Sequence, residues 1–571
     1  MTALGAGTIL PLVGPSPGAV AAPRPTAAGG TAALPPPEVT AGASRTSVAV
    51  AAYDPARYTR AASGALTVSD LGGTPARTGV VHEGEQLAVL TRGCRTVVLT
   101  GPERTFREDK RPLDDTFPRA IAQGGWGLSP GGGGWDTANG EPSDYSVVQG
   151  AGIVSIVRQR PGSRHLTLKD DRVADLDAVI TGSFGAGPAD APRSLALTFG
   201  FQTVSRHCRA RLAFTAAGAV TLRLEKAVSA TSVVSLATAF PVSDSAPADS
   251  SWSVRVERTG TTIRARAWRA DLPEPVLWQV VAENEPLVVG RIGVRADADS
   301  TTTDTELRIS RVRILAATWD TPVTVSHRSW VRVLPQPFDG TWSAGVEERV
   351  RGWLGSTAPD ALGYGWHFLP GAPRVASYRT GPPELGAPVL GTSEYGPPQP
   401  GGARDEGADF HEYMGVDWTF GRVPSGTLTK TADPRFAGAL DCSGYIRMVF
   451  GYHLGVPLAH ESDHTSPGLL PRRSADMAVR APGAVIAQSA AAPPALTGLQ
   501  PGDLVFFDAE TDTGDVIDHV GMALGTDTAG VPRFLSSRKT PNGPTAADLG
   551  GASALTGTGT YATTLRTVRR L

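Results

Sequence analysis

Residues 113–318 consist largely of strand-length runs separated by short turns. Examples are "SVVQGAGIVSIV", "RSLALTFGFQTV", "WSVRVERTG", "TIRARAWRA" and "ELRISRVRIL". No helical period intervenes between these runs, and short strands at this spacing are typical of a β-sandwich or jelly roll. This segment predicts a large all-β domain, which constrains the fold of the chain more than any other feature.

The opening of this segment, "LDDTFPRAIAQGGWGLSPGGGGWDTANGEPSDYSV", contains Asp-Thr-Phe and Gly-Trp-Gly pieces. In these pieces it resembles the first strands of concanavalin-like sandwich modules in minor tail proteins of bacteriophages that infect actinobacteria. The resemblance implies other phage tail proteins as partners. Trp126 and Trp135 have two readings: their rings can stack on the sugars of a cell-surface glycan, or they can belong to the sandwich core.

The 571-residue chain is too long for a single hydrophobic core, and changes in composition divide it into five parts. Residues 1–45 are rich in Ala, Pro and Gly and predict a flexible arm, and alternating runs such as "QLAVLT" predict a small β domain at 46–112. After the sandwich at 113–318, a segment without a sustained period predicts a connector at 319–345. The helical spacing in "GVEERVRGWLGSTAPDAL" marks a mixed domain at 346–571. The predicted fold class is multidomain, with an all-β N-terminal part followed by an α+β domain.

Charge, apolar runs and cysteine content narrow the classes of partner. The 53 basic and 55 acidic residues give a net charge of -2, so neither nucleic acid nor a membrane surface is expected as a partner. No apolar run approaches the 18 residues or so that a membrane span needs. Three widely spaced cysteines predict no disulfide framework, and no metal or cofactor is expected. The apolar part of "ILPLVGPSPGAVAA" is broken by prolines, so we expect a tail there rather than a secretion signal.

The stretch "GALDCSGYIRMVFG" places Cys442 at the start of an expected helix. Asp441 is a typical N-cap residue, and apolar residues follow at helical spacing until Gly451 and Gly455. The free amide groups and the dipole of a helix N-terminus favour the thiolate that a nucleophilic cysteine needs. Cysteine is also among the most often buried residues, so this stretch alone fits an inert thiol as well.

A nucleophilic cysteine requires a base, and His519 is the best placed of the ten histidines. The stretch "LQPGDLVFFDAETDTGDVIDHVGMALG" reads as strand, polar loop and strand, with His519 at the start of the second strand. An imidazole on a sheet beside a helix N-terminus can take the thiol proton and later protonate the leaving amine. A lone histidine at a strand end can equally be a surface residue or make a structural hydrogen bond.

Four motifs between about residues 405 and 571 occur in the order found in a known family. The motifs "DCSGYIRMVFGYHLGVPL", "LPRRSADM", "LQPGDLVFF" and "DHVGMALG" resemble those of the NlpC-type cell-wall peptidases, papain-like cysteine enzymes that cut the peptide stems of peptidoglycan. The resemblance implies Cys442 as nucleophile, His519 as general base and peptidoglycan as substrate. It also places Gly502 and Asp503 in the turn that enters the central strand.

The resemblance suggests three further site residues. The family usually has a third polar residue, commonly His, on the strand after the base. Here "RFLSSRKT" offers Ser536, with Ser537 and Arg538 as competitors. A serine can accept the imidazole N–H but stabilises an imidazolium less than a carboxylate does, so reduced turnover is expected. Tyr413 is expected to polarise the tetrahedral intermediate, as the tyrosine that the family tends to carry before the cysteine. Arg472, with its neighbour Arg473, is expected to contact substrate carboxylates, and a solvated pair of loop arginines is the alternative reading.

Together these features favour a cysteine endopeptidase or amidase that hydrolyses peptide bonds in bacterial peptidoglycan, as a tail-associated wall hydrolase of a phage. The expected location is the virion tail or the extracellular space. Two alternatives stay open. One is a structural tail or adhesion protein whose peptidase-like domain is weak or inactive, and the other is acyl transfer by the same cysteine and histidine.

Overall fold

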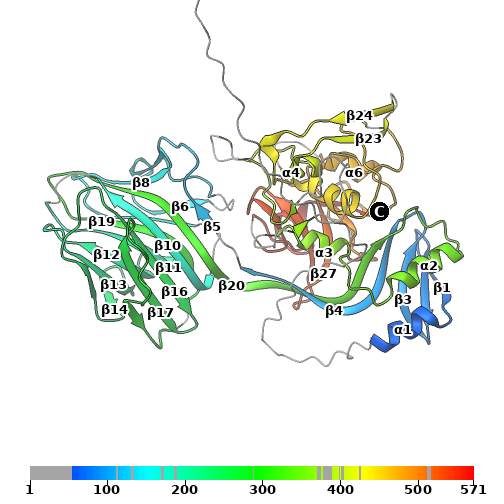
Figure 1. Ribbon diagram of the computed structural model, residues 1–571, viewed down its shortest axis with the longest axis horizontal. Coiled ribbons are helices and arrows are strands. Elements are labelled where there is room, and N and C mark those ends of the chain that lie inside the picture. Colours follow the sequence, from blue (N-terminus) through cyan, green and yellow to red (C-terminus); the bar gives the residue numbers. More distant parts are fainter. Residues whose placement is uncertain are drawn as a thin grey trace, which may run out of the picture. The chain divides into compact units, whose positions relative to one another are not determined.

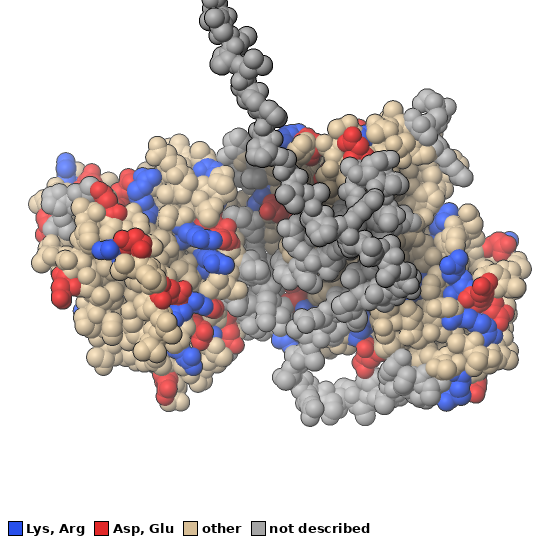
Figure 2. Space-filling view, viewed as in Figure 1, with Lys and Arg blue, Asp and Glu red and all other residues tan. Residues whose placement is uncertain are grey.

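The structure is a computed structural model that describes residues 55–571 with short gaps (Figure 1). Within that range the residues not described are 111–112, 130–133, 169–172, 186–189, 287, 370–374, 377–388, 398, 400–403, 424–425, 464, 511–515 and 549. The arm expected at 1–45 lies outside the described residues. Among the described residues, no helix is both long enough and apolar enough to cross a membrane. On the face shown in Figure 2, basic and acidic side chains of the described residues are interspersed.

A small β unit begins the described part of the chain. It consists of a helix, four strands in the order β1-β2-β3-β4, and part of β20: α1 (Pro55–Ser63), β1 (Thr67–Gly72), β2 (Arg77–His82), β3 (Glu85–Thr91), β4 (Thr96–Lys110) and β20 (Thr305–Val333). Within the range expected as a β domain, 46–112, the described residues from 55 on contain these strands and the helix α1. Its core contains Val80, Leu90, Val97, Leu99 and Trp330.

The strands β4 and β20 form a long antiparallel ribbon whose pairing runs from Thr96 opposite Val333 to Lys110 opposite Thr318. The segment expected as a connector thus differs from expectation, because residues 319–333 continue β20. This part of β20 is buried on two faces: Val323 packs in the core of the C-terminal domain and Trp330 in the core of the small β unit. The alternation of apolar and polar residues at 323–326 does not continue past the register shift between His327 and Ser329, where Trp330 and its neighbour Val331 are buried in different cores.

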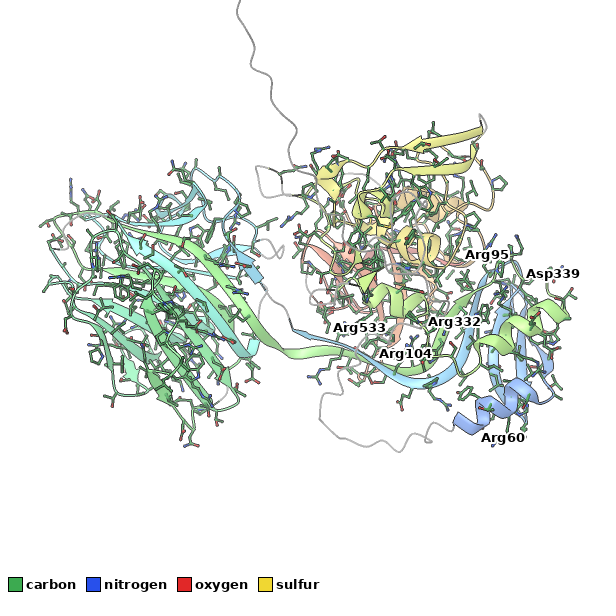
Figure 3. The ribbon with its side chains drawn as sticks, viewed as in Figure 1. Arg60, Arg95, Arg104, Arg332, Asp339 and Arg533 are labelled. Atoms are coloured by element: carbon green, nitrogen blue, oxygen red, sulfur yellow. The ribbon has the colours of Figure 1, made fainter. Side chains whose placement is uncertain are left out.

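The helix α2 (Ala344–Trp353) packs on the small β unit instead of opening the last domain. Val350 is buried in the core of that unit, and the Ser343 side chain caps the helix. The last domain begins near Asp360, which accepts hydrogen bonds from the ribbon at both carboxylate oxygens, each 2.7 Å from an Arg104 nitrogen. Arg104 and Arg332 lie along this ribbon (Figure 3). The boundary expected at 346 therefore moves toward the C-terminus.

The expected sandwich is present as two antiparallel sheets. The first contains the N-terminal part of β20 together with β5 (Leu113–Asp115), β7 (Tyr145–Val148), β8 (Ala151–Ile156), β10 (Val173–Phe184), β16 (Ser251–Thr259), β17 (Thr262–Arg269) and β18 (Val280–Ala282). The second contains β6 (Trp135–Asn139), β9 (Gly162–Leu168), β11 (Arg193–Thr203), β12 (Arg206–Phe214), β13 (Val220–Ala227), β14 (Val233–Ser235), β15 (Phe240–Ser243) and β19 (Arg291–Ala298). A 3-10 turn, Pro142–Asp144, precedes β7.

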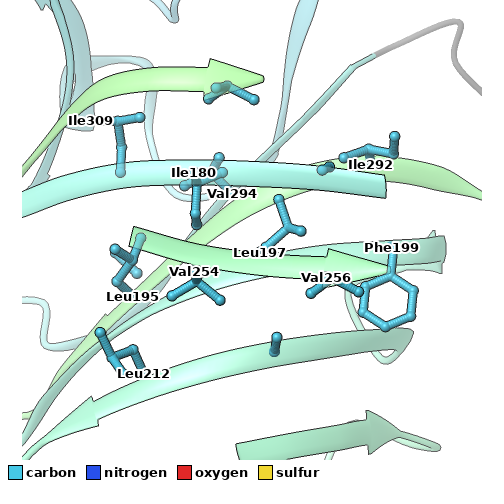
Figure 4. Close-up of a cluster of buried hydrophobic side chains, with 14 of the residues drawn as sticks. Ile180, Leu195, Leu197, Phe199, Leu212, Val254, Val256, Ile292, Val294 and Ile309 are labelled. Atoms are coloured by element: carbon cyan, nitrogen blue, oxygen red, sulfur yellow. The ribbon is translucent and has the colours of Figure 1, made fainter. Parts of the chain in front are cut away.

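Apolar residues from both sheets meet in one core. Figure 4 shows part of it, with Ile180 and Val254 from the first sheet near Leu195 and Leu197 from the second. Trp126 and Trp135 belong to this core: Trp126 is fully buried, and the Trp135 indole donates a hydrogen bond to Asp115 at 2.9 Å. Of their two readings, the core reading is confirmed.

The C-terminal domain has α+β character, as expected. Its helices are α3 (Ala361–Trp366), α4 (Phe410–Met414), α5 (Cys442–Ile446), α6 (Ser474–Arg480) and α7 (Thr560–Thr564), with a 3-10 turn at Pro434–Phe436 and a π-helix at Arg447–His453. Its main sheet contains β25 (Ala484–Gln488), β26 (Leu504–Phe507), β27 (His519–Thr526), β28 (Pro532–Arg538), β29 (Gly543–Thr545) and β30 (Leu565–Arg570). Two short pairs complete it: β21 (Val375–Ala376) with β22 (Val389–Leu390), and β23 (Trp418–Val423) with β24 (Gly426–Lys430).

The main sheet is antiparallel with the order β25-β30-β26-β27-β28-β29, and α5 contacts β27 and β28. The turn into β26 uses Gly502 at a φ of +87°, where a side chain would be strained and a Cβ would lie 2.6 Å from Val331. Asp503 then pairs with the buried Arg570 at 2.8 Å. Gly502 and Asp503 thus form the turn at which the sequence placed them.

Candidate active site

A cavity of about 890 Å³ opens above the start of α5. Its walls come from the loop before α4, from α5 and α6, and from the segment that precedes β27. Cys442 lines it, as do the carboxylate residues Glu406, Glu412, Asp441, Glu461, Glu510 and Asp518 and the basic residues Lys430, Arg472 and Arg473. The lining is therefore predominantly acidic.

Cys442 is the first residue of α5, as the sequence predicts. Asp441 caps the helix, because its Oδ1 accepts a hydrogen bond from the Gly444 amide at 2.7 Å. Glycine is required at 444, since a Cβ there would lie only 2.1 Å from the Ala408 carbonyl oxygen. The helix continues through the π-helical turns to His453, so it ends between the two expected terminators, Gly451 and Gly455.

Asp441 is held in place by a buried network of two aspartates and two arginines. Arg472 donates to both Asp441 oxygens, at 2.6 and 3.2 Å, and to the Ser443 hydroxyl at 2.6 Å. Asp409, which caps α4, accepts from Arg447 at 3.0 and 3.1 Å. Arg472 lines the cavity, but its guanidinium is committed to this network, so the expected contact with substrate carboxylates is replaced by support of the helix cap.

The thiol of Cys442 is buried and protonated. Its Sγ lies 3.8 Å from the carbonyl oxygen of Asp518, the residue before His519, to which the thiol donates. Burial raises the pKa of Cys442 well above its usual range, and the negative charges of Asp441 and Glu406 raise it further. Desolvation and these charges thus oppose the thiolate that the helix N-terminus favours. Cys94 and Cys208 are also buried and without a disulfide, and neither lines this cavity.

His519 begins β27, where the sequence placed it, and its ring is buried against the sheet. Its Nε2 lies 3.1 Å from the Ser536 hydroxyl oxygen on β28. The ring also packs on Tyr561 of α7, with ring centroids 5.2 Å apart. Burial, followed by the positive charges of Arg538 and Lys539, lowers the pKa of His519 to about 3. The imidazole is therefore neutral at physiological pH.

Gly521 lets the strand that carries Ser536 pack closely against β27. Residues 519 and 521 face the same side of the sheet, and the register of β27 with β28 places 521 opposite 536. A Cβ on Gly521 would lie 3.0 Å from the Ser536 Cβ and 2.9 Å from the Leu535 carbonyl oxygen. The glycine of the "DHVG" motif thus allows β28 to lie close to β27 next to Ser536.

Ser536, the best match for the third polar residue, contacts His519, while its two competitors lie elsewhere. Ser537 donates to the Leu440 carbonyl oxygen at 2.6 Å. Arg538 donates from Nε to the Ser536 hydroxyl oxygen at 3.0 Å, behind Ser536 as seen from the ring. Ser536 is thus bonded on one side to the imidazole and on the other to a guanidinium.

Tyr413 is not among the residues that line the cavity. Its hydroxyl donates to the Gly391 carbonyl oxygen at 2.8 Å and accepts from the Gly391 amide at 2.9 Å, which gives Tyr413 a structural role. The tyrosine that lines the cavity with Cys442 is Tyr395, whose hydroxyl donates to Glu406 at 3.1 Å. Sequence reasoning missed Tyr395 because it lies in the Pro/Gly-rich stretch "GTSEYGPP", where no periodic pattern marks it.

Solved structures similar to this chain share little sequence with it. The carbohydrate-binding module CBM66 from Bacillus subtilis is 10% identical, with 31% of this chain and 92% of that chain covered and a TM-score of 0.24. The catalytic domain of an endo-1,3-beta-glucanase from Thermotoga petrophila RKU-1 is 9% identical, with coverage of 38% and 100% and a TM-score of 0.27. The CBM2 module of the evolved Dit of Lactobacillus casei BL23 phage J-1 is 12% identical, with the same coverage and TM-score.

A comparison with curated proteins finds no match for this chain. In a comparison with protein families, residues 421–538 match the NlpC/P60 family. This range contains Cys442, His519 and Ser536 together with the strands and helix that carry them. The resemblance inferred from the four motifs is confirmed there, since all four lie within residues 421–538, which are similar to the NlpC/P60 family.

Proposed function

We propose that this chain is a cysteine endopeptidase that hydrolyses peptide bonds in the stems of bacterial peptidoglycan. The observation that carries the proposal is the placement of the Cys442 thiol at a capped helix start, in a large cavity, against the residue that precedes His519. His519 is in turn bonded to Ser536. These contacts support roles for Cys442 as nucleophile, His519 as base and Ser536 as the residue that orients the imidazole. The NlpC/P60 family match supports wall peptides as the substrate class.

In the proposed reaction, the Cys442 sulfur attacks the scissile carbonyl carbon while His519 takes the thiol proton. The backbone N–H of Cys442 is available to the developing oxyanion, and the Tyr395 hydroxyl lines the same cavity and can take the part expected of Tyr413. His519 then gives its proton to the leaving amine as the C–N bond breaks, which leaves a thioester on Cys442. Water, deprotonated by His519, releases the carboxylate and restores the thiol.

The delivery of this activity is a further part of the proposal. The sandwich opening resembles minor tail proteins of phages, which supports a tail-associated wall hydrolase located in the virion tail or outside the cell, with other tail proteins as partners. Cell-surface glycans are a second proposed partner of the sandwich. Their contact does not use Trp126 or Trp135, because both are buried in its core.

The test is the release of peptide fragments from actinobacterial peptidoglycan, and from several other wall chemistries, by the full chain under reducing conditions. New amino termini are identified by mass spectrometry. The wild type and a Cys208→Ala control, changed in the sandwich core, are expected to release the same fragments, and Cys442→Ala is expected to release none.

Equal release by Cys442→Ala contradicts the cysteine mechanism. If the wild type releases nothing from any wall, the alternative of a structural tail or adhesion protein with an inactive domain is favoured. Release of products joined to an added amine would indicate acyl transfer.

A further inference from the structure

Three residues form a row on one face of the main sheet: His519, Ser536 and Arg538. The His519 Nε2 lies 3.1 Å from the Ser536 oxygen, and the Arg538 Nε lies 3.0 Å from that same oxygen. All three side chains are buried, and Arg538 is only 1% exposed. A buried guanidinium therefore lies one hydroxyl group away from the imidazole.

The Ser536 hydroxyl couples the positive charge of Arg538 to the protonation of His519. An arginine can only donate, so one lone pair of the Ser536 oxygen is occupied by Arg538. A neutral imidazole can accept the serine proton at Nε2. An imidazolium can only donate from Nε2, into an oxygen that already accepts from a cation. The protonated imidazole is therefore disfavoured, whereas a carboxylate in the position of Ser536 favours it.

Arg538 is fixed where it lies. Its Nη1 donates to the Gly551 carbonyl oxygen and its Nη2 to the Ser553 hydroxyl, each at 2.7 Å. The guanidinium also lies over the Tyr561 ring, 4.6 Å from the centroid, and Tyr561 contacts His519 as well. The Arg538 guanidinium thus has a fixed position next to Ser536.

The other charged and titratable groups around His519 leave the effect of Arg538 in place. Lys539 is paired with Glu406 and Glu510, at 2.8 and 2.5 Å. Asp441 next to Cys442 is paired with Arg472, and Glu108 on β4 is bonded to Thr545. Asp518 accepts from the amides of Ala509 and Glu510. Tyr561 and Cys442 are neutral, because burial raises both of their pKa values.

We propose that Arg538 is a positioning residue that acts through Ser536 to keep His519 neutral, so that the resting site is an uncharged thiol and imidazole rather than a thiolate and imidazolium. This inference rests on the proposed function of the same site. The base then takes the thiol proton only as the S–C bond forms, because neither charge is stable before substrate arrives. A resting thiol of this kind reacts slowly with alkylating agents at neutral pH.

The test measures the rate at which iodoacetamide alkylates Cys442 between pH 4 and 10 in the full chain, with each cysteine quantified by peptide mass spectrometry. The wild type is expected to show a rate that rises only at alkaline pH. Arg538→Gln removes the charge and is expected to raise the rate at pH 6 at least tenfold. Arg538→Lys keeps the charge and is expected to retain the wild-type profile. If Arg538 has a merely structural role, both variants lose thermal stability and their alkylation rates depend on pH in the same way. That result would overturn the proposal.

A second measurement uses the wild type alone and stays informative if Arg538→Gln fails to fold. The protonation of ¹³C-labelled His519 is followed by NMR, with its signal assigned by its loss in His519→Gln. The imidazole is expected to stay neutral from pH 8 down to at least pH 5. Protonation of His519 near pH 6.5, or a plateau of fast alkylation at pH 5–7, would overturn the proposal. Both readouts are independent of peptide release, so a failure of the proposed function is distinguished from a failure of this inference.

Discussion

Glu108 on β4 accepts hydrogen bonds from the Thr545 hydroxyl, at 2.9 and 3.0 Å, so the strand that leads into the sandwich is bonded to the last domain. The same carboxylate accepts from the Ala546 amide at 2.7 Å. Burial raises the pKa of Glu108 above its ordinary value. The ribbon and the last domain are thus joined at a buried, titratable carboxyl group, between residues 437 positions apart in the sequence.

We expect Glu108→Ala to destabilise the full chain by about 1–3 kcal/mol, because it leaves a buried amide and hydroxyl without an acceptor. Glu108→Gln keeps an acceptor and is expected to lose less stability than Glu108→Ala. The folded-state pKa of Glu108 is raised, so its contribution to stability is fully present below the unfolded pKa and declines as pH rises through the folded pKa. In urea unfolding, the free energy of unfolding of Glu108→Gln should therefore increase relative to that of the wild type as the pH rises from 4 to 7. Parallel pH profiles of the two proteins would contradict this expectation.

Gly521→Ala tests the space beside His519. The new Cβ would lie 2.7 Å from the Phe534 ring and 3.0 Å from the Ser536 Cβ, so β27 and β28 must shift apart. We expect a loss of about 1–3 kcal/mol in stability and at least a tenfold fall in peptide release.

Gly352→Ala is the matched control, since a Cβ there, in α2, meets nothing within 4 Å. It should leave release unchanged and stabilise slightly, because alanine is the better helix former. Similar losses in both variants would contradict the steric argument.

Asp441→Ala removes both a helix cap and the partner of a buried guanidinium. The lost cap costs about 1 kcal/mol, and the loss of the Asp441 pair with Arg472 adds a cost on the order of 1–3 kcal/mol, because Arg472 keeps only Asp409, at 3.7 Å, and the Ser443 hydroxyl as partners. Asp441→Asn retains an acceptor for Gly444 and Arg472 and is expected to fall between the wild type and Asp441→Ala in urea unfolding. The control is Asp433→Asn, which changes an exposed cap paired with the exposed Arg435 and should alter stability by less than about 0.5 kcal/mol. An Asp441→Ala protein as stable as this control would show that the network carries no stability.

Excision of the sandwich tests the domain boundary. Joining Lys110 to Thr318 through an Asn-Gly turn keeps the paired ribbon, because these two residues face each other in the register. We expect the shortened chain to unfold cooperatively and to release wall peptides. A fragment of residues 346–571 lacks Phe106, Val323, Val325 and Val331, which belong to the core of the last domain. We expect it to be largely unfolded by circular dichroism, and a stable, active fragment would contradict the shared core.

The parts of the molecule that follow local patterns are those that the sequence predicts. The strand runs at 113–318 and the placement of Cys442 and His519 at the starts of a helix and a strand depend on nearby residues, and all three match the structure. The second half of β20 was not predicted, because its burial on two faces comes from partners far away in sequence.

The electrostatics of the site depend on the same long-range contacts. A helix start predicts a thiolate at Cys442, yet the surrounding walls exclude water and keep the thiol protonated. Ser536 was found by its position after the base, whereas the contact of Arg538 behind it needs the geometry of two adjacent strands. Tyr395 lies in a loop, and only the folded chain shows that it lines the cavity that Tyr413 was expected to reach.

The pairing of Lys110 with Thr318 also bears on the order in which the chain folds. If the ribbon formed first, it would close a loop of about 200 residues, at an entropic cost on the order of 4–5 kcal/mol. A sandwich that folds first brings the two ends of that loop together and removes most of this cost. The middle of the chain is therefore expected to fold before the ribbon, and the core of the NlpC/P60 domain, which includes ribbon residues, to form last. The cell-wall activity proposed for this chain would then arise only after the sandwich has folded.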